Sequence, residues 1–213
     1  MSVINSDSVR AGASGAVSEA YTIEQSCRFN DDDTAILTRT PLVAGNRRTW
    51  TFSAWVKRGH ITDNGSLLSA GTNNSTDVDV LRFGADDKLD FIIYHGSAVI
   101  GRIITTQVFR DPSAWYHIVL AVDTTNPTGG NRLRLYINGD EVTSFSTDTN
   151  PTQNYETYIN ATNEHNVGCS LSAATNYFDG YMADVHFIDG QQLAATSFGE
   201  TDDNGQWVPI EFE

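Results

Sequence analysis

Residues 115–142 read WYHIVLAVDTTNPTGGNRLRLYINGDEV, and this stretch decides the fold class of the chain. Two runs rich in β-branched and aromatic residues flank a loop of proline, glycine and asparagine. The second run ends in Asn138-Gly139, the dipeptide that best supplies two consecutive residues of positive φ for a tight hairpin turn. The stretch therefore predicts antiparallel strands joined by turns.

The same pattern begins at Tyr21 and continues along the chain. Residues 50–57 alternate clearly, which predicts a strand with Trp50, Phe52, Ala54 and Val56 on its buried face. Short turns of Gly, Asn, Asp and Pro separate further runs of the same kind. We expect strands at residues 21–29, 80–83, 89–94, 99–105, 115–123, 132–137, 158–168 and 178–188, among others. Many short strands at this spacing predict an all-β, antiparallel β-sandwich of the jelly-roll type.

The chain divides into three parts in this interpretation. Residues 1–20 are small and polar and are interpreted as a flexible N-terminal arm. Residues 21–193 form the sandwich, and residues 194–213 form a C-terminal extension that packs on the sandwich or leaves it. One helical turn is expected, within residues 191–198. The core shared by the two sheets is expected to contain Phe52, Ala54, Val56, Val119, Leu133, Leu135, Ile137 and Val185.

Composition excludes several classes of partner. The 27 acidic residues against 13 basic ones give a net charge of −14, which repels a phosphate backbone, so we expect no nucleic-acid partner. No run approaches the length of a membrane span, so no membrane insertion is expected. The two cysteines, Cys27 and Cys169, are too few for a disulfide framework or a zinc site, and we expect both to be reduced.

The order of the strand motifs carries a resemblance to a known family. TWTFSAWVKRG (49–59), LLSAG (67–71), LRFGADDKLDFIIYHG (81–96), WYHIVLAVD (115–123), NRLRLYINGDEV (131–142) and YFDGYMADVHFIDGQQL (177–193) resemble the successive strands of laminin-G-like, concanavalin A-like domains. The segments at residues 28–59 and 178–209 further resemble virion proteins of bacteriophages, notably fibre proteins of marine phages.

The narrower resemblance implies a structural protein of a phage particle. We expect a non-enzymatic tail fibre or capsid decoration subunit on the virion surface, assembled in the host cytoplasm and attached to other virion proteins through the arm or a sandwich face. Exposed sheet edges and the polar arm favour a homo-oligomer, with a homotrimer expected from the threefold symmetry common in phage fibres. Two alternatives stay open: a lectin module that recognises a host surface glycan, and a glycoside hydrolase-like domain.

Catalytic motifs are not visible in the sequence. A sandwich hydrolase needs two carboxylates on one strand that both point into the cleft, and Asp86, Asp87 and Asp90 come nearest but fall largely in a turn. His117 and His186 fall inside expected strands, where hydrogen-bonded sheet histidines are the better interpretation. We therefore predict no enzymatic activity and no catalytic residues.

Candidate binding residues follow from side-chain type and position. No cofactor is required, and Ca²⁺ is the cofactor that lectin-like sandwiches suggest, with Asp31, Asp33, Asp179 and Asp184 as candidate ligands; the simpler interpretation is that these aspartates cap turns. Aromatic side chains on polar faces or in loops are candidates to stack on sugar rings. These are Trp55, Tyr94, Tyr136, Tyr155, Tyr158 and Tyr177.

Overall fold

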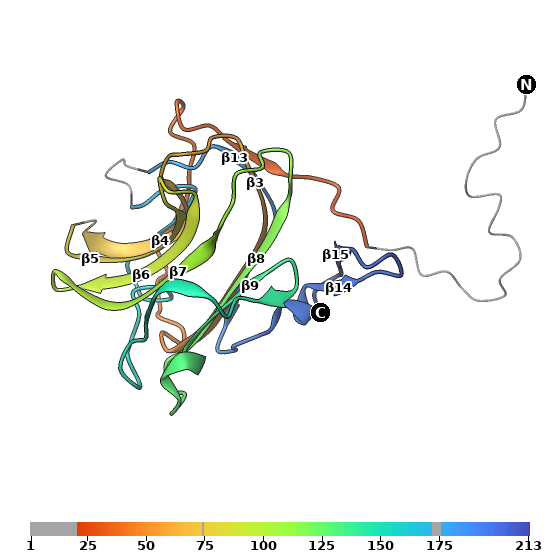
Figure 1. Cartoon of the computed structure of the whole chain (residues 1–213). Helices are drawn as coiled ribbons and strands as arrows, with labels where there is room; N and C mark the ends of the chain where they lie inside the picture. The colour runs from red at the N-terminus through yellow and green to blue at the C-terminus, as the bar shows by residue number, and fades with distance from the viewer. Residues whose placement is uncertain (1–20, 74, 172–175) are drawn as a thin grey trace, which may run out of the picture.

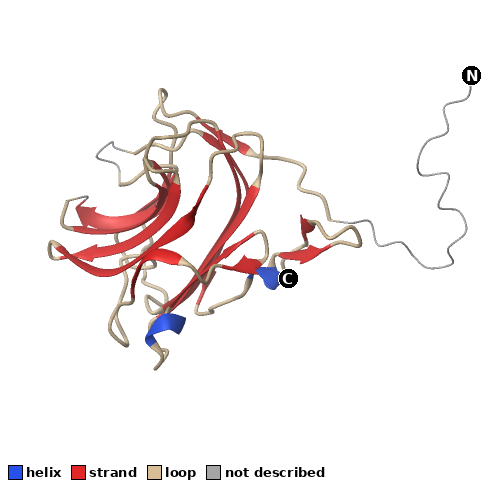
Figure 2. Ribbon diagram, viewed as in Figure 1, coloured by secondary structure: helices blue, strands red, loops and turns tan. Residues whose placement is uncertain are grey.

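The computed structural model describes residues 21–73, 75–171 and 176–213. These residues form two antiparallel β-sheets packed face to face, with almost all regular structure in strands (Figures 1 and 2). The all-β sandwich predicted from the sequence is therefore confirmed. The expected arm at residues 1–20 lies outside the described residues.

Each sheet combines strands that are distant in the sequence. The six-stranded sheet has the order β1 (Cys27–Phe29), β13 (Gly180–Asp189), β3 (Thr49–Arg58), β8 (Tyr116–Asp123), β9 (Leu133–Ile137) and β10 (Asp140–Glu141). The seven-stranded sheet has the order β11 (Phe145–Thr149), β7 (Ala98–Val108), β6 (Lys88–His95), β5 (Asp77–Phe83), β4 (Gly65–Asn73), β12 (Glu164–Val167) and β2 (Leu37–Arg39). A hairpin of β14 (Gly199–Thr201) and β15 (Trp207–Pro209) lies beside the first sheet in Figure 1.

The main core lies between the two sheets. The buried face of β3 contributes the four residues expected there, and Leu133, Leu135 and Ile137 of β9 join the same cluster. Asn138 and Gly139 have φ values of 49° and 90°, so the predicted tight turn joins β9 to β10. The alternation and the turn chemistry therefore determine this part of the fold as predicted.

Two predicted core residues lie elsewhere. Val119 is fully buried, but on the outer face of the six-stranded sheet rather than between the sheets. Val185 is 44% exposed, because the pairing of β13 with β3 shifts register between Ala183 and His186. Such a bulge breaks the alternation on which the prediction for Val185 depended.

A second apolar cluster explains the position of Val119. The C-terminal segment after β13 covers the outer face of the six-stranded sheet, where Phe198, Trp207 and Phe212 pack against it. A 3₁₀ turn at Ala195–Ser197 supplies the single helical turn expected near the C-terminus, and a second one spans Gly129–Asn131. No helix among the described residues is long and apolar enough to cross a membrane.

Two predicted strands are shorter in the structure. The first begins at Cys27 rather than at residue 21, and the preceding residues run as an extended segment without strand pairing. The strand expected at 158–168 is limited to β12, because the buried carboxylate of Asp79 accepts hydrogen bonds from the backbone N–H groups of Tyr158 and Ile159 and holds them in a loop. Cys27 is exposed, Cys169 is buried, and both are free thiols.

Candidate functional site

Three tryptophans surround two neighbouring clefts beside the outer face of the six-stranded sheet. Trp55 projects from β3, Trp115 immediately precedes β8, and Trp207 begins β15. The register of β3 and β8 pairs Trp55 with His117, which brings Trp55 and Trp115 to the same end of the sheet. We call the two hollows the tryptophan clefts, because Trp55 and Trp115 line both of them.

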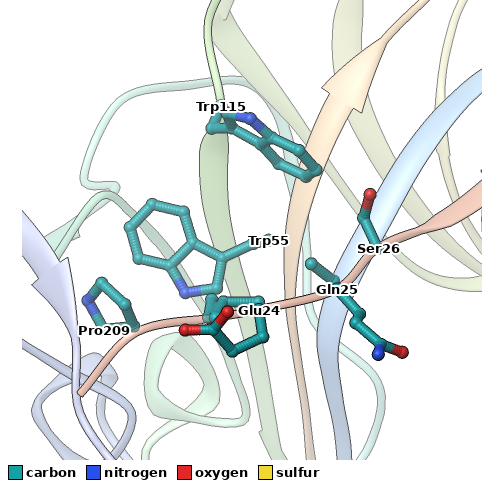
Figure 3. A pocket seen from close by; sticks show the side chains of 8 residues that line it. Glu24, Gln25, Ser26, Trp55, Trp115 and Pro209 are labelled. Atoms are coloured by element: carbon teal, nitrogen blue, oxygen red, sulfur yellow. The ribbon is translucent and has the colours of Figure 1, made fainter.

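The first cleft lies between the extended N-terminal segment and the sheet. Its volume is about 300 Å³, and it is lined by Ile23, Glu24, Gln25, Ser26, Trp55, Trp115, Ala183 and Pro209. In the view of Figure 3, the Trp55 ring lies between Trp115 and Pro209, and the segment that carries Glu24 and Gln25 runs alongside. The cleft thus combines indole faces with the carboxylate of Glu24 and the hydroxyl of Ser26, whereas the Gln25 amide points away from the rings in this view.

The second cleft lies between the sheet and the C-terminal hairpin. Its volume is about 470 Å³, and it is lined by Trp55, Trp115, Asn138, Asp140, Thr201, Gly205, Gln206 and Trp207. Small-ligand sites typically have volumes of about 300–1,000 Å³. The second cleft falls within this range, and the first lies at its lower bound. Trp115 is 37% exposed, so its ring is available to a ligand. The indole N–H of Trp55 is buried and has no hydrogen-bond partner among the described residues.

A stack of rings holds the wall of the second cleft in place. The Trp55 and His117 rings lie 4.9 Å apart between centroids at 27°, and the His117 and Trp207 rings lie 5.9 Å apart at 25°. The indole Nε1 of Trp207 donates to Nδ1 of His117 at 3.0 Å, and Nε2 of His117 lies 2.9 Å from the hydroxyl of Ser53. Because Nδ1 accepts, the imidazole is neutral and carries its proton on Nε2.

Burial keeps His117 neutral. Its side chain is almost completely buried, and desolvation, with a smaller contribution from His186, lowers the pKa of His117 from 6.5 to about 4. The imidazole therefore fixes the orientation of Trp207 over the whole range near neutral pH. The expectation of a hydrogen-bonded sheet histidine at this position is confirmed by the structure.

Glycines make room for the third tryptophan. A Cβ atom on Gly139 would approach the Trp207 ring to 2.4 Å, and one on Gly199 would approach it to 2.6 Å. Gly139 belongs to the tight turn between β9 and β10, so the same residue forms the hairpin and seats Trp207. The turn that decides the fold therefore also shapes the cleft.

The sequence-predicted aromatic residues do not form one site. Of the six candidates, only Trp55 lines the tryptophan clefts. Tyr136 is 6% exposed beneath the C-terminal segment, so it is a packing residue and not a surface platform. Tyr94 packs on the outer face of the seven-stranded sheet, and Tyr177 lines a small cavity beside Phe178.

Tyr155 and Tyr158 do come together, around His95. Nδ1 of His95 lies 2.7 Å from the Tyr155 hydroxyl, and Nε2 lies 2.7 Å from the buried carboxylate of Asp79. The Tyr158 hydroxyl donates to Asp77 at 3.1 Å. Burial raises the pKa of both tyrosine hydroxyls, so both stay protonated near neutral pH. This network attaches the loop before β12 to the interior strands β5 and β6 of the seven-stranded sheet.

The four candidate metal ligands do not form a single cluster. Asp31 and Asp179 line one small cavity together with Arg58, and Asp179 forms an ion pair with Arg28 at 2.6 Å. Asp33 accepts a hydrogen bond from Asn30 within its own turn, and Asp184 accepts one from Tyr21. The oxygen and nitrogen atoms that Asp31, His60 and Asp63 offer lie within 4.8 Å of one another. Oxygen ligands are what Ca²⁺ prefers, and this trio offers a histidine nitrogen in place of one of them.

A third hollow opens at one edge of the sandwich, between β2 and β13. We call it the edge groove; its volume is about 580 Å³. Its lining includes Val43, which is 80% exposed, and Leu37, Val185 and Phe187, which are 40–54% exposed. Contiguous apolar exposure of this kind marks a contact surface.

Sequence reasoning missed Trp115 and Trp207. Trp115 was assigned to a strand, whereas it lies one residue before β8 at the sheet end. Trp207 follows an Asp-Asp-Asn-Gly turn in the C-terminal extension, and its partner His117 is 90 residues away in the sequence. Three of the four tryptophans meet here, and the remaining one, Trp50, is a core residue.

The chain belongs to the concanavalin A-like lectin/glucanases superfamily, whose sequence profile matches residues 29–196. This is the laminin-G-like, concanavalin A-like class predicted from the strand motifs. No curated protein sequence matches the chain significantly.

Solved structures show the same sandwich at low sequence identity. Domains LG4-5 of the mouse laminin α1 chain match with a TM-score of 0.57 at 12% identity, covering 89% of this chain and 46% of that one. A native heptameric SAP-like pentraxin from Limulus polyphemus matches with a TM-score of 0.51 at 17% identity, covering 79% and 73%. The CBM40 domain of the Ruminococcus gnavus IT-sialidase, bound to α2,3-sialyllactose, matches with a TM-score of 0.50 at 13% identity, covering 75% and 95%.

Proposed function

We propose that this protein is a non-enzymatic carbohydrate-binding module that holds sugars in the tryptophan clefts. The observation that carries the proposal is the convergence of Trp55, Trp115 and Trp207 on two adjoining hollows. The apolar C–H face of a sugar ring packs on an indole, and nearby amides and carboxylates bind its hydroxyls. Asn138 and Gln206 line the second cleft and Glu24 lines the first, so each cleft has such a group beside the rings.

The comparisons support a binding role. The family name covers both lectins and glucanases, and one similar structure is a CBM40 domain bound to sialyllactose. The fold alone is shared with that domain at 13% identity, so the assignment of sugar binding to this chain depends on the tryptophan clefts themselves.

The arrangement of carboxylates favours binding over hydrolysis. Glu24 lines the first cleft and Asp140 lines the second. Trp55 and Trp115 form the wall that both clefts share. A glycosidase needs two carboxyl groups on either side of one glycosidic bond, one of them an acid of raised pKa, which burial in an apolar pocket supplies. Glu24 and Asp140 are both exposed to solvent. We also propose that binding needs no metal, because the candidate metal ligands line neither cleft.

The edge groove favours a second role, attachment to other proteins. We propose that the module is a fibre or decoration subunit on the surface of a bacteriophage particle, assembled in the host cytoplasm as a homo-oligomer, with a trimer expected. The exposed apolar side chains of the edge groove support a protein contact at this edge. Among the described residues, none lines both the edge groove and a tryptophan cleft, so the clefts would then remain free for a host glycan.

The binding proposal is tested with the full chain on a glycan array, followed by isothermal titration of the sugars that bind. We expect Trp115→Ala to weaken binding about two- to twelvefold, since stacking on an aromatic side chain contributes on the order of 0.5–1.5 kcal/mol. Tyr94→Ala is the matched control, because Tyr94 lies on the other sheet. Unchanged binding in Trp115→Ala, or equal loss in both variants, would contradict the location of the site.

The attachment proposal is tested on phage particles purified from an infected host. We expect the chain in the particle fraction, and we expect Val43→Asp, in an exposed residue of the edge groove, to reduce its copy number. Deletion of residues 2–20 should also abolish incorporation if the arm attaches the subunit. Normal loading of both variants would contradict attachment through these regions.

A further inference from the structure

The tryptophan clefts carry negative charge and no compensating positive charge. Of the described residues that line either cleft, Glu24 and Asp140 are acidic, and none is lysine, arginine or histidine. The chain as a whole has a net charge of −14, so its long-range electrostatic field attracts cations, as the carboxylates in the clefts also do. A ligand that enters either cleft therefore meets one carboxylate and at least two indole rings.

This combination selects for positive charge on the ligand. The face of an indole has negative potential and attracts an organic cation, and tryptophan is the best of the aromatic residues for this contact. A carboxylate beside the ring adds a charge-assisted hydrogen bond to an ammonium group. A sugar that carries a carboxylate would instead be repelled by Glu24 or Asp140, with no arginine in either lining to pair with it.

We propose that the tryptophan clefts are specific for amino sugars with a free, protonated amine, the sugar ring stacking on Trp55 or Trp115 while the ammonium group pairs with Glu24 in the first cleft or Asp140 in the second. This inference rests on the proposed sugar-binding function and names the chemical class of its ligand. The carboxylate in each cleft can accept a hydrogen bond from a neutral sugar hydroxyl, but a protonated amine binds it through a stronger, charge-assisted hydrogen bond.

The test compares three oligosaccharides of equal length and different charge. The probes are the tetramers of glucosamine, N-acetylglucosamine and galacturonic acid, titrated calorimetrically into the full chain at about pH 5.5. At this pH most of the amines are protonated, and His117, with a pKa of about 4, is still neutral. We expect the glucosamine tetramer to bind about five- to tenfold more tightly than the acetylated one.

Two variants separate specific binding from general attraction to an acidic protein. Glu24→Gln removes a carboxylate from the first cleft and should reduce the ratio of amine to acetylated binding toward one. Asp32→Asn removes the same charge from an exposed turn that lines neither cleft, so it should leave that ratio unchanged. Raising the salt concentration should reduce the ratio as well, because the ion pair is exposed to screening.

The outcomes distinguish failure of the specificity for amino sugars from failure of sugar binding itself. Equal binding of the glucosamine and N-acetylglucosamine tetramers would overturn the specificity and leave sugar binding intact. A ratio that falls equally in Glu24→Gln and Asp32→Asn would overturn it too, since the preference would then be a property of net charge. Tightest binding of the galacturonic acid tetramer would overturn the assigned charge preference, and absence of binding by all three would overturn the specificity together with the sugar-binding function for these classes.

Discussion

The indole N–H of Trp207 and the imidazole of His117 join the C-terminal hairpin to the six-stranded sheet through one hydrogen bond of 3.0 Å and a stacked contact. The same contact forms the wall of the second cleft, because Trp207 lines that cleft directly. The C-terminal segment is therefore part of the binding surface as well as a cover for the sheet. Its stability and the shape of the cleft should change together.

Replacement of Trp207 tests this contact. Trp207→Phe keeps the ring and removes the N–H donor, and we expect a loss of about 1 kcal/mol in the free energy of unfolding. Trp207→Ala also removes the packing, and we expect a loss of about 3 kcal/mol. Urea unfolding measures both. Trp115→Ala is the control, since it deletes the same ring from a more exposed position and should cost less; equal losses from Trp115→Ala and Trp207→Ala would contradict the structural role of Trp207.

Acid should weaken the fold through His117. The pKa of His117 is lowered from 6.5 to about 4, so between these values the unfolded chain binds a proton that the folded chain does not. Stability is therefore highest above pH 6.5 and falls as the pH drops toward 4, by about 3 kcal/mol in total for a difference of 2.5 pKa units. Protonation also removes the acceptor of the Trp207 hydrogen bond.

Urea unfolding at several pH values between 7 and 4 measures this dependence. The aspartates with lowered pKa values, such as Asp111 and Asp202, contribute below their ordinary value of 3.8, outside this window. His165, whose pKa burial also lowers from 6.5, contributes in this window with the same sign, so His117→Gln should reduce the slope of the curve without removing it. His60→Gln, in an exposed side chain, is the control. A curve of unchanged slope in His117→Gln would show that another group controls the acid response.

A methyl group at Gly139 should disturb the turn and the cleft together. Gly139→Ala places a Cβ at a φ of +90° and against the ring of Trp207, so we expect destabilisation of about 2 kcal/mol or more and weaker sugar binding. Gly130→Ala is the matched control, because a Cβ at Gly130 meets nothing within 4 Å. Thermal unfolding followed by circular dichroism compares the two. If both variants melt alike, the close approach of Gly139 to Trp207 has no energetic role.

Loss of the Asp79 carboxylate should release the loop before β12. Asp79 is fully buried and accepts hydrogen bonds from the backbone N–H groups of Tyr158 and Ile159 and from His95. Asp79→Asn exchanges a charged acceptor for a neutral amide, and we expect a loss of about 3 kcal/mol. Hydrogen exchange at Tyr158 and Ile159 should accelerate. Asp203→Asn, in an exposed turn, should change neither quantity, and protected amides at Tyr158 and Ile159 in Asp79→Asn would contradict the account.

The sequence predicts the sandwich well because its signals are local. Alternation in residues 50–57 places Phe52 and Val56 in the core, and Asn138-Gly139 defines the hairpin turn. The prediction that Val185 lies in the core is wrong, because a bulge in β13 interrupts the alternation. Tyr136 falls on an outward face as its position in the strand implies, but the C-terminal segment covers that face.

The candidate site is predicted less well because it is built from distant segments. Only Trp55 could be selected from its own strand pattern, as an aromatic residue on a polar face. Trp115 and Trp207 acquire their roles when the N-terminal segment, the end of β8 and the C-terminal hairpin meet at one end of the sheet. A local pattern contains no information on such a meeting of distant segments.

Titration of the ¹⁵N-labelled protein with the glucosamine tetramer, followed through the indole N–H resonances of the four tryptophans, tests the central claim most directly. Trp55 and Trp115 line both clefts and should shift most, with a smaller change at Trp207. Trp50 should not move, because it is fully buried and its Nε1 donates to the Thr157 hydroxyl at 3.1 Å. Saturable shifts confined to the cleft tryptophans are the predicted result. Unshifted Trp55 and Trp115 signals at a saturating sugar concentration, or equal shifts of all four, would contradict a sugar site in the tryptophan clefts.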